Sequence, residues 1–231
     1  MAEHVAATSG PSPFDGIVVP SAASGASSLD GVAPPPEVPF ENVETCKRLL
    51  YGGRVGVSIP LQWEDMCELR PMPDNQEAFF SGLGEGASLI FEIVERIETD
   101  ADVAGYFFED YADAASAASR ELYASGPVAS AGAPACVVAL GHQVLPKNEI
   151  NEAPHGVDVG ILCFRFPAQE TDMLCTLNVP ALRGSRLRRD VSDLAAQPGM
   201  APLAAVAASL TVDLALFGVG VDLQPDDDRG G

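Results

Sequence analysis

Residues 157–166 read VDVGILCFRF, and residues 173–179 read MLCTLNV. In both stretches apolar side chains recur at every second position, which is the period of a β-strand with one buried face. The short polar segment from Gln169 to Asp172 lies between them. Two strand-like runs joined in this way predict an antiparallel hairpin. We therefore expect a sheet that is largely antiparallel.

Three other segments show strand signals. In residues 53–59, Val55 and Val57 alternate with small neighbours, and Pro60 follows at a place where a strand ends naturally. Residues 88–97 and 135–144 are further apolar runs. These segments add at least three strands to the predicted hairpin.

Two segments have helical spacing instead. From Val103 to Leu122, apolar residues recur every three or four positions until Gly126 and Pro127 end the pattern. A second helix is predicted from Leu203 to Phe217 by the same spacing. Each helix has one apolar stripe that must cover another element. Strands and helices in this order predict an α+β fold, with helices packed on the faces of an antiparallel sheet.

The chain has 231 residues, a length that suggests one domain plus tails. Residues 1–43 are rich in Pro, Ala and Ser, and such a composition cannot bury enough apolar surface to offset chain entropy. We expect a disordered tail at 1–43, a folded domain at 44–220 and a short acidic tail at 221–231.

The chain is strongly acidic. It has 33 Asp and Glu against 13 Lys and Arg, for a formal net charge of −20. Such a surface repels nucleic acid and anionic membranes, so neither is expected as a partner. A basic protein surface is the better candidate, because long-range attraction would speed the encounter.

Five cysteines, an odd number without a C-x-x-C pair, argue for free thiols in a reducing compartment. The first residues carry no secretory or transit signal. The longest apolar stretch, Met200 to Val212, is shorter than the ~18 residues that span a bilayer. Nucleus and cytoplasm are the expected locations.

No catalytic motif is recognised. His142 and His155 lie outside any nucleophile motif, and they are interpreted as a sheet-face residue and a turn residue. Cys136, Cys163 and Cys175 lie within predicted strands, which favours buried thiols over metal ligands. We expect no catalytic residue, no metal and no cofactor.

Two loops leave open alternatives. Residues 82–86 read GLGEG, but they precede a strand and not a helix, so a flexible hairpin loop is favoured over a phosphate site. A basic loop contains Arg183, Arg186, Arg188 and Arg189. It is either a solvated loop or a contact for an acidic partner.

One polar segment is harder to explain as a simple loop. Residues 68–80 read ELRPMPDNQEAFF. Pro71 and Pro73 fix two backbone angles, while Asp74 and Asn75 favour a turn. This predicts a rigid connection ahead of the strand at residue 88, one that displays Asp74 and Glu77. It is either a capped surface loop or a binding segment.

With these segments the chain resembles the Ran guanine-nucleotide release factors, the Mog-type nuclear transport family. The resemblance covers about residues 49–218. Its most specific element is Pro-Asp-x-Gln-Glu at residues 73–77. The matching segments are LYGG at 50–53, LRPMPDNQE at 69–77, YFFED at 106–110, Phe166, Gln169, Thr171-Asp172 and NVP at 178–180. The Pro/Ala/Ser tail, residues 112–118 and the loop at 183–199 depart from the family pattern.

The resemblance implies a twisted antiparallel sheet sandwiched by helices, as in Mog and PsbP proteins. It also implies a monomer that binds the small GTPase Ran, promotes guanine-nucleotide release and modulates nucleocytoplasmic transport. The alternative is a small-molecule-binding or enzymatic module on a PsbP-like fold.

In the family, an acidic surface binds the partner, and its residues can be matched one by one to positions in this sequence. The implied partner-binding residues are Arg70, Pro71, Pro73, Asp74, Gln76, Glu77, Glu109 and Asp110. Asp74 and Glu77 are the first choices, because they carry charge in the most specific motif. No covalent chemistry is implied.

Overall fold

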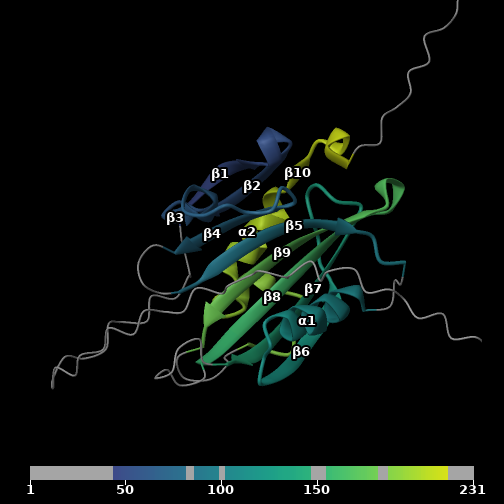
Figure 1. Ribbon diagram of the computed structural model, residues 1–231. Coiled ribbons are helices and arrows are strands. Elements are labelled where there is room, and N and C mark those ends of the chain that lie inside the picture. The colour runs from purple at the N-terminus through teal and green to yellow at the C-terminus, as the bar shows by residue number, and fades with distance from the viewer. Residues whose placement is uncertain (1–43, 82–85, 99–101, 147–154, 182–186, 218–231) are drawn as a thin grey trace, which may run out of the picture.

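A computed structural model describes residues 44–81, 86–98, 102–146, 155–181 and 187–217 (Figure 1). The tails expected at 1–43 and 221–231 lie outside the described residues, as do residues 82–85 of the expected hairpin loop. Within the described ranges the chain forms two antiparallel sheets and two α-helices.

The larger sheet has seven strands in the order β3-β4-β5-β9-β8-β7-β6, all paired antiparallel. Along the chain these strands are β3 Trp63–Asp65, β4 Gln76–Ser81, β5 Ser88–Glu95, β6 Ser119–Pro127, β7 Ala135–Leu145, β8 His155–Phe166 and β9 Thr171–Pro180. The smaller sheet has the order β1-β2-β10, with β1 Thr45–Leu50, β2 Val55–Pro60 and β10 Thr211–Val212. The described residues also form five short 3₁₀ turns: η1 Tyr51–Gly53, η2 Met66–Glu68, η3 Pro167–Gln169, η4 Leu194–Ala196 and η5 Leu214–Phe217.

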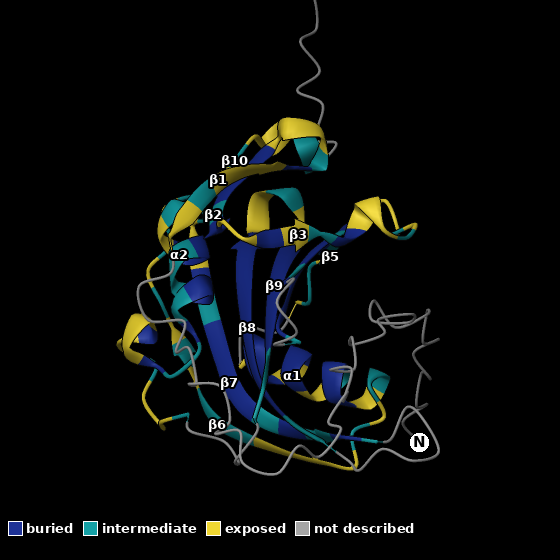
Figure 2. Cartoon of the chain, turned by 90° about the vertical axis from the view of Figure 1, so that its left-hand side faces the viewer, coloured by how far each residue is buried: buried dark blue, intermediate teal, exposed yellow. Residues whose placement is uncertain are grey.

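The two α-helices cover opposite faces of the larger sheet. Helix α1, Val103–Ala114, packs with one face of β7, β8 and β9 in one apolar cluster. Helix α2, Ala201–Ser209, lies in a second cluster between the other face and the smaller sheet. Figure 2 shows α1 and α2 on either side of β7 and β8, with buried residues lining both contacts. This confirms the α+β fold predicted from the sequence.

The predicted hairpin is confirmed. Strand β9 pairs with β8 over its whole length, from Val157 opposite Pro180 to Phe166 opposite Thr171. The connection lies two residues earlier than expected: η3 and Glu170 make the turn, and Asp172 already lies within β9. Glu170 has a positive φ of 50°, which lets the chain reverse there.

The first helix was predicted too long. It ends at Ala114, Ser116 takes a positive φ of 51°, and the following residues form β6. Ala114 and Leu122 pack on the same apolar cluster, the first from the helix and the second from a strand. Their spacing in the sequence therefore resembled one continuous helix. Pairing with β7 decides the outcome, since it satisfies the backbone groups on the side of β6 that faces β7, apart from an irregularity between Leu122 and Ala124.

The second helix was also predicted too long. It ends at Ser209, after which Leu210 adopts an extended ψ of 130°. Thr211 and Val212 then pair with β2, and η5 follows. Leu210 and Phe217 still pack on the same cluster as α2. The apolar spacing therefore marked buried residues, but these residues are not helical.

Besides β6 and β10, three more strands were not predicted: β1, β3 and β4. β1 is exposed over most of its length and β3 has only three residues, so neither shows a clear alternation. The buried thiols are confirmed, because Cys136, Cys163 and Cys175 lie in the core and all five cysteines are free. Among the described residues, no helix is long and apolar enough to cross a membrane.

Candidate functional site

The segment of residues 69–77 leads from η2 into β4, at the edge of the larger sheet. Hydrogen bonds to the next strand hold its backbone in place: the Ile93 amide donates to the Asn75 carbonyl at 3.0 Å, and the Asn75 side-chain amide donates to the Ile93 carbonyl at 3.1 Å. The Gln76 amide closes a turn onto the Pro73 carbonyl at 2.9 Å. Pro71, Pro73 and Asp74 remain exposed on this anchored turn.

Gln76 is buried on the face of the sheet that α1 covers. It is 6% exposed, and its Nε2 donates to Glu92 Oε1 at 2.8 Å. Asn75 Nδ2 makes a longer bond to the same oxygen at 3.5 Å. The segment is thus tied to β5 through a side chain as well as through the backbone.

Glu92 itself is a buried acid, only 1% exposed. Burial raises the pKa of its carboxyl to about 7, the bonds from Gln76 and Asn75 oppose this rise, and the nearby Asp110 carboxyl adds to it. Within the described part of the chain, Glu92 Oε2 has no hydrogen-bond partner. Glu92 therefore exchanges its proton near neutral pH, beside a second acid.

Glu77 points to the opposite face of the sheet, because successive strand residues alternate. Its carboxylate accepts a hydrogen bond from the backbone amide of Tyr51 in η1. Burial raises the pKa of Glu77, the bond from the Tyr51 amide opposes this rise, and Asp65 adds to it. The Tyr51 hydroxyl donates to the Asn75 carbonyl at 3.2 Å, so η1 also holds the 69–77 segment in place through Asn75.

These contacts correct part of the sequence interpretation. Glu77 was expected to be displayed on a connection, but it belongs to β4 and is half-buried. Gln76, expected as a partner-binding residue, lies in the same strand and is buried. Arg70 is also half-buried, and its Nε lies buried without a hydrogen-bond partner among the described residues. Asp74 is the charged residue of the motif that stays exposed.

The structure separates the two acids predicted on α1. Glu109 is exposed and forms an ion pair with Arg120 of β6, with 2.7 Å between Oε2 and Nε. Asp113 contacts the same guanidinium. Asp110 is half-buried, and its charge acts on Glu92 of β5, while Glu109 pairs with β6.

The sequence interpretation missed Glu92 and Tyr51. Glu92 is the acid within the apolar run SLIFEIV at residues 88–94, and a charge inside such a run was the available signal. Tyr51 lies in the matched LYGG segment, but nothing in the sequence places it against Asn75 or Glu77.

The two histidines lie elsewhere. His142 is on a sheet face in β7, as predicted, and its Nδ1 lies 2.9 Å from Asp158 Oδ1. His155 was predicted in a turn, but it is the first residue of β8, where it pairs with Leu145 and extends the strand. In the described ranges, no three His, Cys, Asp or Glu side chains gather closely enough to hold a metal ion.

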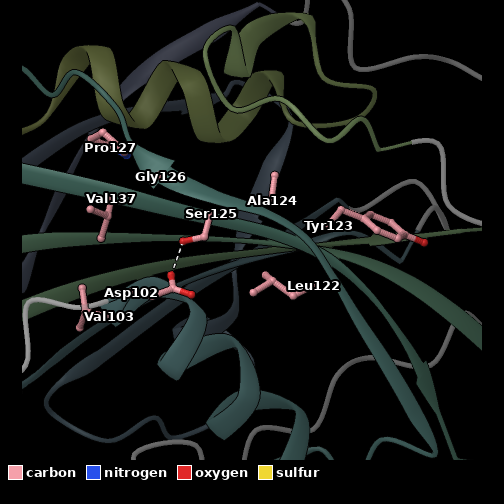
Figure 3. A pocket seen from close by; sticks show the side chains of 9 residues that line it. All are labelled: Asp102, Val103, Leu122, Tyr123, Ala124, Ser125, Gly126, Pro127 and Val137. Atoms are coloured by element: carbon pink, nitrogen blue, oxygen red, sulfur yellow. Dashed lines mark hydrogen bonds between the residues drawn. The ribbon is translucent and has the colours of Figure 1, made fainter.

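A surface cavity of about 520 Å³ lies where α1 begins beside β6 (Figure 3). It is lined by Asp102, Val103, Leu122, Tyr123, Ala124, Ser125, Gly126, Pro127 and Val137. Asp102 is the one acidic residue in this lining, and its carboxylate already accepts hydrogen bonds from the Gly105 amide and from Ser125 Oγ. Neither histidine lines it, so this cavity lends no support to an enzymatic site built on His142 or His155.

Only the end of the basic loop is described. Arg189 pairs with Glu121 at 3.0 Å and lies 5.9 Å from the centre of the Tyr123 ring. The Arg188 amide donates to Gln197 Oε1 at 2.9 Å. Arg183 and Arg186 lie outside the described residues.

Comparisons with known proteins agree with this architecture. Residues 48–180 match the family described as Ran-interacting Mog1 protein. A Danio rerio protein named Ran guanine nucleotide release factor is 33% identical over 144 residues, covering 58% of this chain and 77% of the relative. The nuclear import protein mog1 of Schizosaccharomyces pombe is 27% identical over 156 residues, covering 63% and 82%.

Among solved structures, the Ran-binding protein Mog1p of Saccharomyces cerevisiae is similar to this chain. Its TM-score is 0.59 at 19% identity, and the match covers 76% of this chain and 99% of Mog1p. At this identity the likeness concerns the fold.

Proposed function

Because the chain belongs to the Ran-interacting Mog1 family, we propose that it binds the small GTPase Ran and promotes release of its guanine nucleotide. In this role it modulates Ran-dependent transport between nucleus and cytoplasm, acts in both compartments and works as a monomer. It performs no covalent chemistry. The names of the relatives support the partner, and the geometry of the 69–77 segment supports the place of binding.

The observation that carries the proposal is the anchored, exposed Asp74. Gln76 ties the segment to Glu92 on one face of the sheet, and Glu77 ties it to Tyr51 on the other. A contact residue held in one conformation loses little entropy on binding. An ordinary surface loop needs no such support from two faces.

Nucleotide release follows from differential binding. A release factor shifts the equilibrium by as much as it prefers nucleotide-free Ran over loaded Ran, about 1.4 kcal/mol for each factor of ten. The exposed Asp74, together with Asp110 on α1, offers negative charge that competes with phosphate for basic groups or pairs with a basic patch beside the nucleotide.

The test is the loss of a fluorescent guanine nucleotide from loaded Ran. Catalytic amounts of the protein should speed this loss, and added salt should weaken the effect because exposed charges drive the encounter. Release at the uncatalysed rate, at low salt and with the protein in excess, would show that the chain is not a release factor.

A further inference from the structure

Strand β6 ends the larger sheet and has one open edge. It pairs with β7 on one side, and among the described residues no strand pairs with its other side. No backbone hydrogen bond of the described chain reaches that side either. Charged residues and proline protect such edges from pairing with another chain, and β6 has Arg120 and Glu121 near one end and Pro127 at the other. The unprotected part is therefore residues 122–126.

The backbone of Ser125 faces this open edge. The Val128 amide donates to the Cys136 carbonyl at 3.0 Å, and the register with β7 runs without a break from Ala124 to Pro127. In an antiparallel pair, residues bonded to the partner alternate with residues that turn both backbone groups away from it. Since Val128 and Gly126 are of the first kind, Ser125 turns its amide and its carbonyl toward the open edge.

The surface cavity of about 520 Å³ in Figure 3, which we call the β6 groove, adjoins this edge. Its two polar side chains bond each other, since Ser125 Oγ donates to Asp102. The apolar lining comes from Val103, Leu122, Pro127 and Val137. An open strand edge beside an apolar wall suits an extended peptide that adds a strand and places apolar side chains in the groove.

The N-terminal part of the same chain contains such a peptide. Residues 16–20 read GIVVP, a run of three β-branched residues between a glycine and a proline. β-Branched residues favour strands, and Gly and Pro are typical of their ends. In a strand Ile17 and Val19 point to one side and Val18 to the other. These residues lie outside the described part of the chain.

We propose that residues 16–19 add to the open edge of β6 as a further strand, with Ile17 and Val19 in the β6 groove. The backbone of Ser125 bonds the added strand. The proposal does not depend on Ran binding, because the groove is separate from the 69–77 segment.

The connection to the domain is long enough for this docking. The 24 residues from 20 to 43 lead to Glu44 and can span up to about 80 Å. A domain the size of residues 44–220 has a radius of gyration of about 16 Å, so the groove is within reach. Tethering in one chain gives an effective concentration on the order of 1 mM, at which even a weakly bound strand is populated.

The C-terminal stretch 219–223 also alternates apolar residues, but it fits the groove less well. It follows Phe217 closely, and the Phe217 ring lies 5.0 Å from that of Phe166 on β8. A strand added beyond β6 lies three strand spacings from β8, about 14 Å. Crossing that distance takes about four residues, which leaves Leu223 as the one apolar residue of the stretch for the groove.

Residue-resolved amide hydrogen exchange of the full chain tests the proposal. The Ser125 amide should exchange about tenfold more slowly than in a variant with Ile17→Asp and Val19→Asp, because a charged side chain does not enter the apolar groove. The matched control is Val32→Asp with Val38→Asp, which adds the same charge to the same N-terminal part and should leave the Ser125 amide protected.

A pair of groove variants tests the contact from the other side. Ser125→Pro removes the outward amide and keeps the pairing with β7, so residues 17–19 should lose their protection. Ser125→Ala removes the same hydroxyl but keeps the amide, so it should preserve that protection. If Ser125→Pro fails to fold, the Asp variants decide.

Three results would overturn the inference. The first is an unchanged Ser125 exchange rate in the Ile17→Asp, Val19→Asp variant. The second is protection that grows with protein concentration, which would assign the edge to a second copy. The third is protection lost on removal of residues 218–231, which would assign it to the C-terminal stretch.

Discussion

Gln76 and Glu77 are neighbours in the chain, but their side chains act on opposite faces of the seven-stranded sheet. Gln76 bonds Glu92 on the face covered by α1, and Glu77 receives the Tyr51 amide on the face toward the smaller sheet. Strand alternation requires this separation. As a result two adjacent motif residues hold the binding segment from both sides, and the exposed Asp74 is left to meet a partner.

Asp74→Lys should weaken Ran binding by at least tenfold and leave the thermal midpoint nearly unchanged. The residue is exposed, so the reversal turns attraction to a basic surface into repulsion at little cost in stability. Affinity by calorimetry and thermal unfolding measure the two effects separately.

The matched control is Glu44→Lys, which changes net charge equally at an exposed residue just before β1. Since β1 runs six residues from there to η1, the change lies about 20 Å from Tyr51. If both variants lose affinity to the same extent, bulk charge and not Asp74 carries recognition.

Glu77→Ala should destabilise the fold as well as weaken binding. The substitution leaves the half-buried Tyr51 amide without its acceptor, at a cost of about 1–3 kcal/mol. Glu77→Gln keeps an acceptor oxygen and should recover most of that stability. Urea unfolding of both variants checks this, and an unchanged unfolding midpoint in Glu77→Ala with lost binding would mark Glu77 as a direct contact.

Glu92→Gln should stabilise the protein more at about pH 8 than at about pH 5. The carboxyl has a pKa of about 7 in the folded protein against 4.5 for the free group. Its contribution to the free energy of unfolding is therefore fully present below pH 4.5 and is lost as the pH rises through about 7. The full difference corresponds to about 3 kcal/mol, and glutamine removes it. Urea unfolding at both pH values measures the change. Equal gains at the two pH values would mean that the buried acid does not titrate as described.

Arg165→Met should lower the free energy of unfolding by about 3–5 kcal/mol, because it leaves the buried Asp172 carboxylate without its cationic partner. The two side chains are 6% and 0% exposed, pair at 3.2 Å across β8 and β9, and both contact the Ile97 backbone ahead of α1. Burial raises the pKa of Asp172 and Arg165 opposes that rise, so the loss should grow with pH. Chemical denaturation at two pH values measures it.

A pair on the surface provides the comparison. Arg54 and Asp213 lie 2.9 Å apart with side chains 48% and 55% exposed, so Arg54→Met should cost less than ~1 kcal/mol. Adding Asp172→Leu to Arg165→Met should restore much of the lost stability. Equal costs for the exposed and buried single variants would contradict this assignment.

The sequence by itself determined the central strands and the family. Residues 88–97, 135–144, 157–166 and 173–179 alternate or run apolar because one or both faces of these strands are buried, and that signal is local. The start of α1 was likewise visible, since Val103, Phe107 and Tyr111 recur at helical spacing and all three are buried. The motif at 73–77 carried the resemblance to the Mog-type family.

Tertiary structure alone decided where the helices stop and what the motif residues do. Residues 119–127 became a strand because β7 pairs with them on both sides of an irregularity between Leu122 and Ala124, and this preference is not encoded in their own spacing. Glu92 was visible as an acid in an apolar run, but only the folding of β4 and α1 against β5 brings Gln76 and Asp110 to it. Strand pairing and the burial of charge depend on residues distant in the chain, so local periodicity carries no record of them.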